Sequence, residues 1–236
     1  MRILSIDTSA RSCSAAVMDS SGLLAEITTV TGHTHSRQVM AMIHSVLELS
    51  GMGISRIDGF AFTKGPGSFT GLRIGISTIL GLAAATRKPI VGVSGLDALA
   101  LQSAAPDIAI CPLIDAGKNE VYCARYRWDH GGLIRESSER SVSPAEAIEN
   151  IHAPVLLTGS GAQRYRSLIQ EQLGSLARFA PDDQGILKSA TIARISLKRF
   201  ETHDVDDMFR MEPLYIRKPD AKIQVPLFSL PPVQNI

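Results

Sequence analysis

Two aspartates end apolar runs that read alike. The run at 2–7 is RILSID and the run at 109–115 is AICPLID. If the runs are equivalent strands of a two-lobed clamp, Asp7 and Asp115 face each other across a cleft. Two carboxylates in such a cleft could orient Mg²⁺ or water for phosphate chemistry. The alternative is that each aspartate simply ends its strand.

A glycine-rich segment, KGPGSFTGLR at 64–73, lies between an apolar run and a helical pattern. Gly65 and Gly67 permit positive φ and close backbone approach, and free N–H groups in the next helical turn would suit an anion. The segment matches neither G-x-x-x-x-G-K-[ST] nor G-x-G-x-x-G. A tight structural turn is the alternative. A second glycine motif, GSG at 159–161 after the apolar run 154–158, could also let the backbone approach a nucleotide, and its alternative is an ordinary turn between a strand and a helix. The residues of the candidate nucleotide cleft are Asp7, Thr8, Ser9, Gly65, Gly67, Ser68, Asp115, Gly159, Ser160 and Gly161.

Signatures of several other chemistries are missing. No H-x-x-x-H pair occurs among the six histidines, no G-x-S-x-G elbow is present, and the cysteines Cys13, Cys111 and Cys123 form no C-x-x-C. Helical zinc sites, hydrolase elbows and disulfide frameworks depend on these spacings. We therefore assign no catalytic and no metal-ligating residue.

The elements that would position these residues repeat twice. In residues 1–106 we expect strands at 2–7, 13–18, 23–30, 59–63 and 89–93, with helices at 36–50, 71–85 and 96–103. In residues 107–216 we expect strands at 109–115, 120–127, 133–141 and 154–158, with helices at 144–150, 162–174 and 186–202. Three strands followed by alternating helices and strands predict an α/β protein of two tandem ribonuclease-H-like subdomains, as in actin-like ATPases. The last helix could pack back on the first subdomain, and residues 217–236 read as an extended, proline-rich tail.

Two of the expected helices are too apolar for a single buried face. The apolar arc of 36–50 covers roughly half the helix, whereas a stripe of about 100° suffices for one-sided packing. The functional interpretation is a partner surface, and deep burial in one core is the alternative. The partner-facing residues would be Met40, Ile43, Leu47, Gly71, Gly75, Ile76 and Ile79.

The composition of the chain argues against several classes of protein. The chain has 236 residues, 44% of them hydrophobic, and a formal net charge of +1. The near-zero net charge argues against a protein that coats nucleic acid, because such a protein needs a basic face. The sequence also lacks the run of about 18 apolar residues that a membrane span needs. No signal-peptide pattern opens the sequence. The expectation is a cytoplasmic protein with no membrane contact.

Several stretches of the sequence resemble the TsaB (YeaZ) family of the TsaD/Kae1-like superfamily. They are ILSIDTSARSCSAAV at 3–17, GHTHSRQVMAMI at 32–43, TKGPGSFTGLRIGIS at 63–77, DAGKNEVY at 115–122 and EPLYIR at 212–217. The resemblance extends to about Arg217. It implies the actin-like (ASKHA) fold and a non-catalytic scaffold for a TsaD-type paralogue, which forms N6-threonylcarbamoyladenosine at position 37 of tRNAs that read codons starting with A.

The resemblance also implies the partners. These are the TsaD-type paralogue, a TsaE-type ATPase, and a second copy of the chain when it is isolated. It implies tRNA contact only through the complex and no cofactor in this chain, with ATP or ADP as a candidate ligand at the interface of the complex. One departure agrees with a non-catalytic role, because the positions of the two metal-binding histidines of TsaD fall on Gly95 and Leu99.

Two rival functions remain open at this stage. One is a free-standing actin-like ATPase or sugar kinase that uses Asp7, Asp115 and the glycine turns. The other is a glycoprotease-like metallopeptidase, for which the sequence offers no ligands. We expect no bound catalytic metal and weak or absent ATPase activity in the isolated chain.

Overall fold

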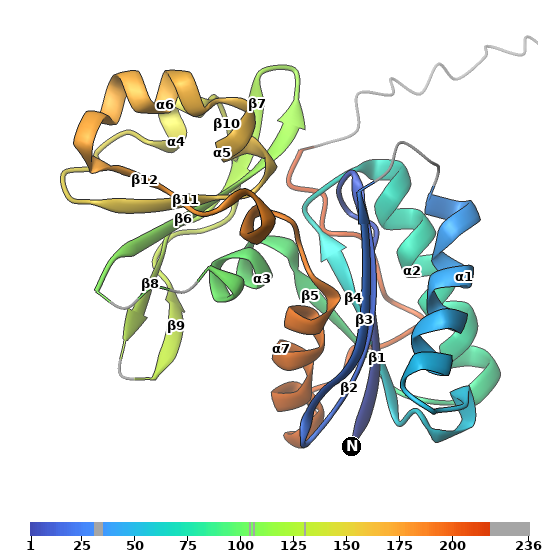
Figure 1. The fold of residues 1–236 in the computed structure, drawn as a ribbon. Helices are drawn as coiled ribbons and strands as arrows, with labels where there is room; N and C mark the ends of the chain where they lie inside the picture. Colours follow the sequence, from blue (N-terminus) through green and yellow to red (C-terminus); the bar gives the residue numbers. More distant parts are fainter. Residues whose placement is uncertain (31–34, 104, 106, 130, 218–236) are drawn as a thin grey trace, which may run out of the picture.

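The chain folds into two lobes, each built on its own β-sheet (Figure 1). The computed structural model describes residues 1–30, 35–103, 105, 107–129 and 131–217. The predicted tail beyond Arg217 and the residue His33 lie outside these described residues.

The first sheet has the strand order β3-β2-β1-β4-β5. β1 pairs antiparallel with β2 and parallel with β4, so the sheet opens as a meander and continues as a parallel layer. The turn between β2 and β3 forms because the Ser21 N–H and hydroxyl donate to Asp19 Oδ1, while Gly22 adopts a φ of 130°. The strands are β1 (Arg2–Asp7), β2 (Ser12–Asp19), β3 (Gly22–Val30), β4 (Gly59–Gly65) and β5 (Ile90–Ser94).

The second sheet repeats this order as β10-β7-β6-β11-β12. Its strands are β6 (Ala109–Gly117), β7 (Glu120–Cys123), β10 (Arg140–Val142), β11 (Val155–Thr158) and β12 (Ala177–Phe179). Each lobe thus has the ribonuclease-H-like arrangement, and the predicted α/β class with actin-like architecture is confirmed.

The second lobe departs from the predicted strands at a hairpin. The runs expected at 120–127 and 133–141 each split, and β8 (Tyr126–Asp129) pairs with β9 (Gly132–Arg135) outside the main sheet order. The split occurs because the backbone of Arg125 bonds to Ser137 and Glu136, on the returning chain, instead of to β6. The short strand β12 has no counterpart in the sequence prediction.

Helices cover both faces of the first sheet (Figure 1). α1 (His35–Leu49) and α2 (Phe69–Thr86) lie on one face, and α7 (Ser189–Glu201) contacts β1, β2, β4 and β5 on the other. Ser189 joins α7 to the sheet, because its carbonyl accepts from Ser5 Oγ and its N–H donates to Ser14 Oγ. A helix late in the chain therefore completes the core of the first lobe.

The remaining helices are short. They are α3 (Gly95–Gln102), α4 (Pro144–Ala147), α5 (Ser160–Arg164), α6 (Arg166–Leu173) and the 3₁₀ helices Ile54–Arg56, Gly174–Leu176 and Asp182–Gly185. α4 begins at a reciprocal capping box that Ser143 and Glu146 form.

α2 is long and apolar enough to suit a membrane span by length and composition alone. In this fold it is a surface helix instead. Leu72, Ile76, Ile79 and Ala83 pack into the core of the first lobe, and α2 contacts β4 along its length.

Candidate functional site

A small cavity lies between the lobes, and two of the ten residues predicted for the cleft line it. Ser9 from the first lobe and Ser160 from the second both line it, although 151 positions separate them in the sequence. Its volume is about 80 Å³, whereas pockets for drug-sized ligands measure about 300–1,000 Å³. Apolar side chains contribute much of the lining, including Leu99, Ile114, Ile186 and Leu187. This cavity is too small for a nucleotide.

Asp7 is fully buried and does not line this cavity. Its Oδ1 accepts from the Ser9 N–H at 3.1 Å and the Ser9 hydroxyl at 2.6 Å. Its Oδ2 is buried and has no hydrogen-bond partner among the described residues. Burial raises the pKa of Asp7, and the two Ser9 hydrogen bonds only partly oppose it. The structure thus does not support Asp7 as a carboxylate that holds Mg²⁺ or water in a cleft.

Asp115 is occupied by its own chain. Its Oδ2 accepts from Arg164 Nη1 at 2.7 Å, and its Oδ1 accepts from the Gly117 N–H at 3.1 Å. The Asp115 N–H in turn donates to Ser160 Oγ. Asp7 ends β1, whereas Asp115 lies two residues before the end of the equivalent strand β6. The Asp115 side chain is 25% exposed, but its two oxygens already have partners within the chain.

The glycine-rich segment packs against the end of β1. Ser68 caps α2 by accepting from the Gly71 N–H, and the Ser68 N–H donates to the Ser9 carbonyl at 2.7 Å. A Cβ at Gly67 would clash with the same Ser9 carbonyl, and one at Gly71 would clash with that of Thr8. These contacts support the interpretation of a structural turn, because they place neighbouring backbone where an anion would lie.

Close packing against the backbone also explains the other glycines of the predicted cleft. Gly65 has a φ of 133°, and its built Cβ would lie 2.6 Å from the Leu214 carbonyl. Cβ atoms at Gly159 and Gly161 would lie 2.6 and 2.9 Å from the Leu113 carbonyl. All three positions require glycine for packing within the chain.

The positions aligned with metal-binding histidines are apolar and buried. Leu99 is 2% exposed and lines the cavity, and Gly95 is buried against Thr63 and Ile114. Within the described residues, no group of three or more histidine, cysteine, aspartate or glutamate side chains could hold a metal ion.

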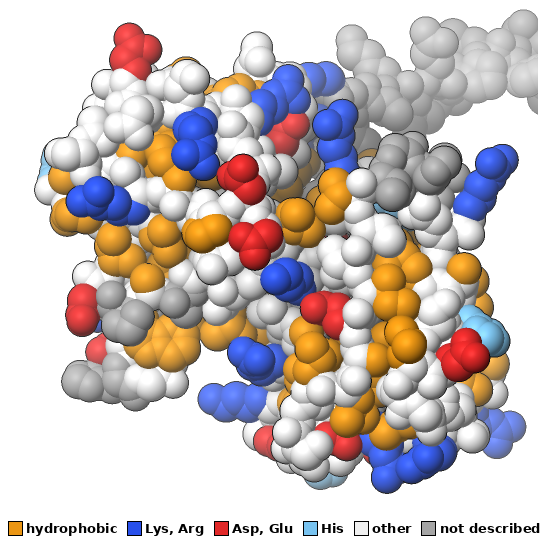
Figure 2. Space-filling view, viewed as in Figure 1, with side chains coloured by type: hydrophobic (Ala, Val, Ile, Leu, Met, Phe, Trp, Pro, Cys, Tyr) orange, Lys and Arg blue, Asp and Glu red, His pale blue; other side chains and the backbone are white. Residues whose placement is uncertain are grey.

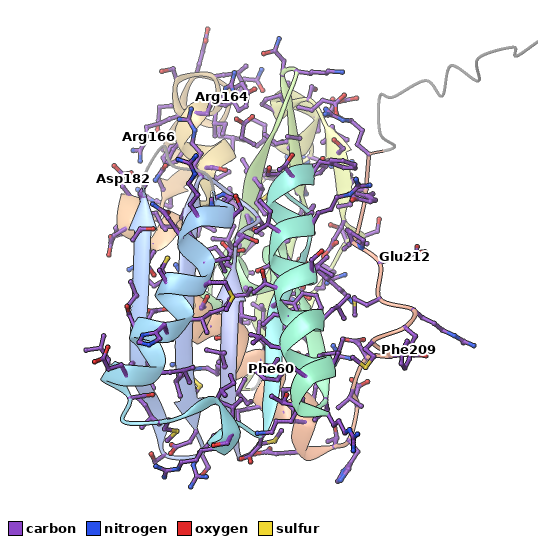
Figure 3. All side chains as sticks on the ribbon, turned by 90° about the vertical axis from the view of Figure 1, so that its right-hand side faces the viewer. Phe60, Arg164, Arg166, Asp182, Phe209 and Glu212 are labelled. Carbon is purple, nitrogen blue, oxygen red and sulfur yellow. The ribbon has the colours of Figure 1, made fainter. Side chains whose placement is uncertain are left out.

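α1 and α2 form an outer layer that no other element covers in the view of Figure 3. Five of the seven predicted partner residues nevertheless point inward and are buried: Ile43, Gly71, Gly75, Ile76 and Ile79. Gly71 and Gly75 allow α2 to approach Thr8, not a facing helix. The structure therefore corrects the prediction, and these five residues belong to the core of the first lobe.

The outward side of the layer carries a different set. Met40 is 51% exposed and Leu49 is 69% exposed, while Leu47 is half-buried. Gly81 on α2 is exposed, and a Cβ built there meets no atom within 4 Å. Gly81 is the same residue type on the same helix as Gly71 and Gly75, so only the packing distinguishes them.

An aromatic cluster at the start of α2 was missed by the sequence analysis. The rings of Phe69 and Tyr215 stack with centroids 5.2 Å apart, and the Arg73 guanidinium lies 3.8 Å above the Phe69 ring. Arg73 Nε also donates to the Tyr215 hydroxyl at 3.1 Å. The residues are 146 positions apart at most, so no local pattern could predict the contact.

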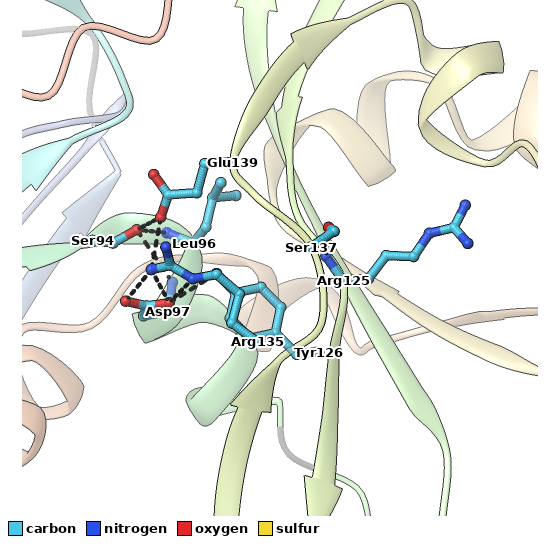
Figure 4. A network of polar contacts seen from close by, with 8 residues as sticks. All are labelled: Ser94, Leu96, Asp97, Arg125, Tyr126, Arg135, Ser137 and Glu139. Atoms are coloured by element: carbon cyan, nitrogen blue, oxygen red, sulfur yellow. Dashed lines mark hydrogen bonds and ion pairs between the residues drawn. The ribbon is translucent and has the colours of Figure 1, made fainter.

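A polar network joins the lobes at the start of α3 (Figure 4). Arg135 donates to both oxygens of Asp97 at 2.6 Å, and the Tyr126 hydroxyl donates to Asp97 at 2.9 Å. Ser94 donates to Glu139, which is also 3.0 Å from Arg135. Burial raises the pKa of Glu139 more than the charge of Arg135 lowers it. The β8–β9 hairpin thus holds the start of α3 in place through the contacts of Tyr126 and Arg135 with Asp97.

Charge is mixed over the surface. On the face drawn in Figure 2, lysine and arginine side chains lie among aspartates and glutamates over both lobes. A duplex or tRNA coat would need a continuous basic surface, and this face does not provide one.

Comparisons with known proteins cover almost the whole chain. A family model described as TsaD: tRNA N6-adenosine threonylcarbamoyltransferase matches residues 23–225. The tRNA threonylcarbamoyladenosine biosynthesis protein TsaB of Escherichia coli (strain K12) is 30% identical over 96% of this chain and 99% of its own. The protein of the same name from Bacillus subtilis (strain 168) is 28% identical over 94% and 96%.

A solved structure has the same fold. YeaZ from Pseudomonas aeruginosa superimposes with a TM-score of 0.77 at 24% identity, and the match covers 91% of this chain and 99% of that one. The similarity thus includes both lobes and the helical layer.

Proposed function

The chain belongs to the TsaB family of tRNA threonylcarbamoyladenosine biosynthesis proteins, and from that membership we propose that it is a non-catalytic scaffold subunit, which binds and activates a TsaD-type catalytic paralogue. A role in forming N6-threonylcarbamoyladenosine follows from the family.

The uncovered layer of α1 and α2 carries the proposal. Beside polar side chains such as Arg37, His44 and Glu48, this layer exposes the apolar residues Met40 and Leu49 and the small residues of α2. Exposed apolar surface of this kind is typical of a protein–protein contact. A paralogue with the same fold carries an equivalent layer, so the two layers can pack as a four-helix contact.

The interior of the cleft supports the non-catalytic part. Asp7 is buried, Asp115 is paired with Arg164, and the cavity of about 80 Å³ is lined largely by apolar residues. Phosphoryl transfer depends on exposed groups that position Mg²⁺ and phosphate. On this proposal the chain binds no cofactor of its own, and ATP or ADP would be held at the interface of the complex.

The proposal also includes the further partners of the chain and its location in the cell. In the complex, a TsaE-type ATPase joins the pair, and tRNA reaches this chain only through its partners. The isolated chain forms a homodimer through the same helix layer. The protein is cytoplasmic and makes no membrane contact.

Charge substitutions on α1 test the proposal. Met40→Glu places a carboxylate in the proposed contact, and burying an unpaired charge costs several kcal/mol, so binding to the paralogue should fall at least about a hundredfold. Leu47→Glu should act in the same direction. Ser45→Glu, about 140° around the helix from Met40, is the matched control. Co-purification with the TsaD-type subunit and the level of modified adenosine 37 are the measurements.

The outcome separates the rival functions. If Met40→Glu and Leu47→Glu fold, bind the paralogue as the wild type does and leave the tRNA modification intact, the assignment of the α1–α2 layer as the partner surface is wrong. ATP turnover near the kinase range of about 1–100 s⁻¹ by the isolated chain would instead support a free-standing ATPase.

A further inference from the structure

The two lobes are joined where the chain crosses between them, once after α3 and once between the 3₁₀ helix Asp182–Gly185 and α7 (Figure 1). Two-lobed proteins close around a ligand by bending at such crossings, where a few residues absorb the change in backbone angles. A segment can bend in this way when few contacts hold it to its surroundings. The contacts at the two crossings therefore determine whether the lobes can move.

Gln102, the last residue of α3, bonds one crossing to the other. Its side-chain amide donates to the carbonyls of Gln184 and Ile186 at 2.8 and 2.7 Å. Its Oε1 accepts from the Lys188 N–H at 3.1 Å and from the Thr191 hydroxyl at 3.4 Å. A glutamine side chain has two N–H donors and one oxygen with two lone pairs, so these four contacts use its full capacity. One side chain thus fixes the path of the chain from the second lobe into α7.

The residue after Gln102 adds a buried hydrogen bond to the second lobe. The Ser103 hydroxyl donates to the Thr158 hydroxyl at 2.8 Å, and both side chains are almost fully buried. Thr158 ends β11 of the second sheet. At the start of α3, Asp97 accepts from Arg135 of the β8–β9 hairpin. α3 is therefore bonded to the second lobe at both of its ends.

The lobes also share apolar packing. One buried cluster contains Val91 of β5, Leu96 of α3, Ile110 of β6 and Ile192 of α7. α3 itself contacts β4 and β5 of the first sheet and β6 of the second. Opening the lobes would expose this shared cluster to water, and the free-energy cost rises with the apolar area exposed.

We propose that the two lobes form one rigid body, locked at the end of α3 by the positioning residues Gln102 and Ser103, so that the chain does not close its lobes around a nucleotide. A ligand between the lobes would meet the preformed cavity of about 80 Å³ instead of a closing clamp. Partners would likewise meet elements of both lobes at fixed relative positions. The inference goes beyond the proposed function and does not depend on which surface binds the paralogue.

Spin labels on the two lobes of the full chain test this inference. The labelled positions are Ser20→Cys, in the turn between β2 and β3, and Glu171→Cys, on α6, both of which are exposed. The native cysteines Cys13, Cys111 and Cys123 are buried, so the label reacts at the introduced residues. Double electron–electron resonance measures the distribution of distances between the labels, with and without Mg²⁺ and ATP. An excess of unlabelled chain suppresses distances between copies.

Two variants weaken the lock, and a third is the control. Gln102→Met keeps an unbranched side chain of similar length and loses all four hydrogen bonds. Ser103→Ala is milder, because it removes one hydrogen bond between the lobes. Gln170→Met is the matched control, because Gln170 is exposed on α6 and donates to the Gly174 carbonyl within the second lobe.

The wild type should give one narrow distance distribution, which Mg²⁺ and ATP leave unchanged. Gln102→Met should widen the distribution, and it should speed hydrogen exchange of the Lys188 amide about tenfold, because this N–H loses its acceptor. Ser103→Ala should widen the distribution less. Gln170→Met should match the wild type in both measurements.

The opposite outcomes overturn separate parts of the inference. A wild-type distance that shortens with Mg²⁺ and ATP would show a closing clamp, and the rigid body would be wrong. A narrow distribution in both folded lock variants would show that apolar packing alone holds the lobes, and equal widening in Gln170→Met would show that the effect is not specific; either result refutes the lock. If Gln102→Met does not fold, Ser103→Ala decides, and an unchanged distribution in that variant refutes the lock.

Discussion

Two glycines on α2 allow a direct test of which side of this helix faces the protein interior. Gly71→Ala and Gly81→Ala make the same chemical change, ten residues apart on one helix. At Gly71 the new methyl group would point at the backbone carbonyl of Thr8. At Gly81 it would point into open space.

The two substitutions should change the free energy of unfolding in opposite directions. The Cβ of Gly71→Ala would lie about 1 Å inside the closest approach that real Cβ atoms make, and relieving such overpacking costs about 1–3 kcal/mol. The atom in the way is backbone, held by the hydrogen-bonded end of β1, so it cannot simply rotate aside. Gly81→Ala gains about 0.5–1 kcal/mol, because alanine loses less conformational entropy in a helix than glycine does.

Urea unfolding followed by circular dichroism measures both free energies of unfolding. A change of 1 kcal/mol corresponds to about 2–4 °C in the unfolding midpoint of a chain of this size, so thermal scans give a second reading. Equal stabilisation by both substitutions would show that Gly71 faces outward. In that case the assignment of Gly71 and Gly75 to the core would be refuted, and the original partner-surface prediction for them would be restored.

Two further substitutions test the buried polar groups. Asp7→Asn should raise stability at neutral pH: burial raises the pKa of Asp7, so its stabilising contribution is complete below the ordinary value of 3.8 and is lost as pH rises through the raised pKa. Unfolding midpoints of wild type and Asp7→Asn should therefore converge at pH 3.5 and separate by pH 7, and parallel curves would contradict this. Arg135→Met should cost about 1–3 kcal/mol, because it leaves Asp97 and the 7%-exposed side chain of Glu139 without their cation. Glu139→Gln in the same background should restore part of that loss in urea unfolding, and no restoration would show that Glu139 does not depend on Arg135.

Local pattern was sufficient for most of the fold. The two runs that end at Asp7 and Asp115 are equivalent strands, because an apolar run that ends in a carboxylate and is followed by a turn is a local signal. The hairpin β8–β9 was not predictable in this way. Residues 120–127 form one β-prone run, and it splits only because Arg125 bonds to Ser137, twelve residues away.

The candidate site was less predictable, because residue type does not show direction. Gly71, Gly75 and Gly81 are the same residue on the same helix, yet the first two contact Thr8 and the third faces outward. Asp115 has the chemistry of a metal ligand, but Arg164 at the end of α5, 49 residues later in the sequence, forms an ion pair with it.

The packing of α7 on the first sheet has a consequence for biosynthesis. The first sheet is complete in sequence at Ser94, but the helix that covers its second face ends at Glu201, about a hundred residues later. At about 5–20 residues per second, a ribosome needs roughly 5–20 s to make the intervening stretch. For that time the nascent first lobe exposes Ile3, Val91 and their neighbours, which α7 later buries. The first lobe therefore cannot finish folding while the second is still being made. Until α7 emerges from the ribosome, its apolar surface stays available to chaperones that bind nascent chains.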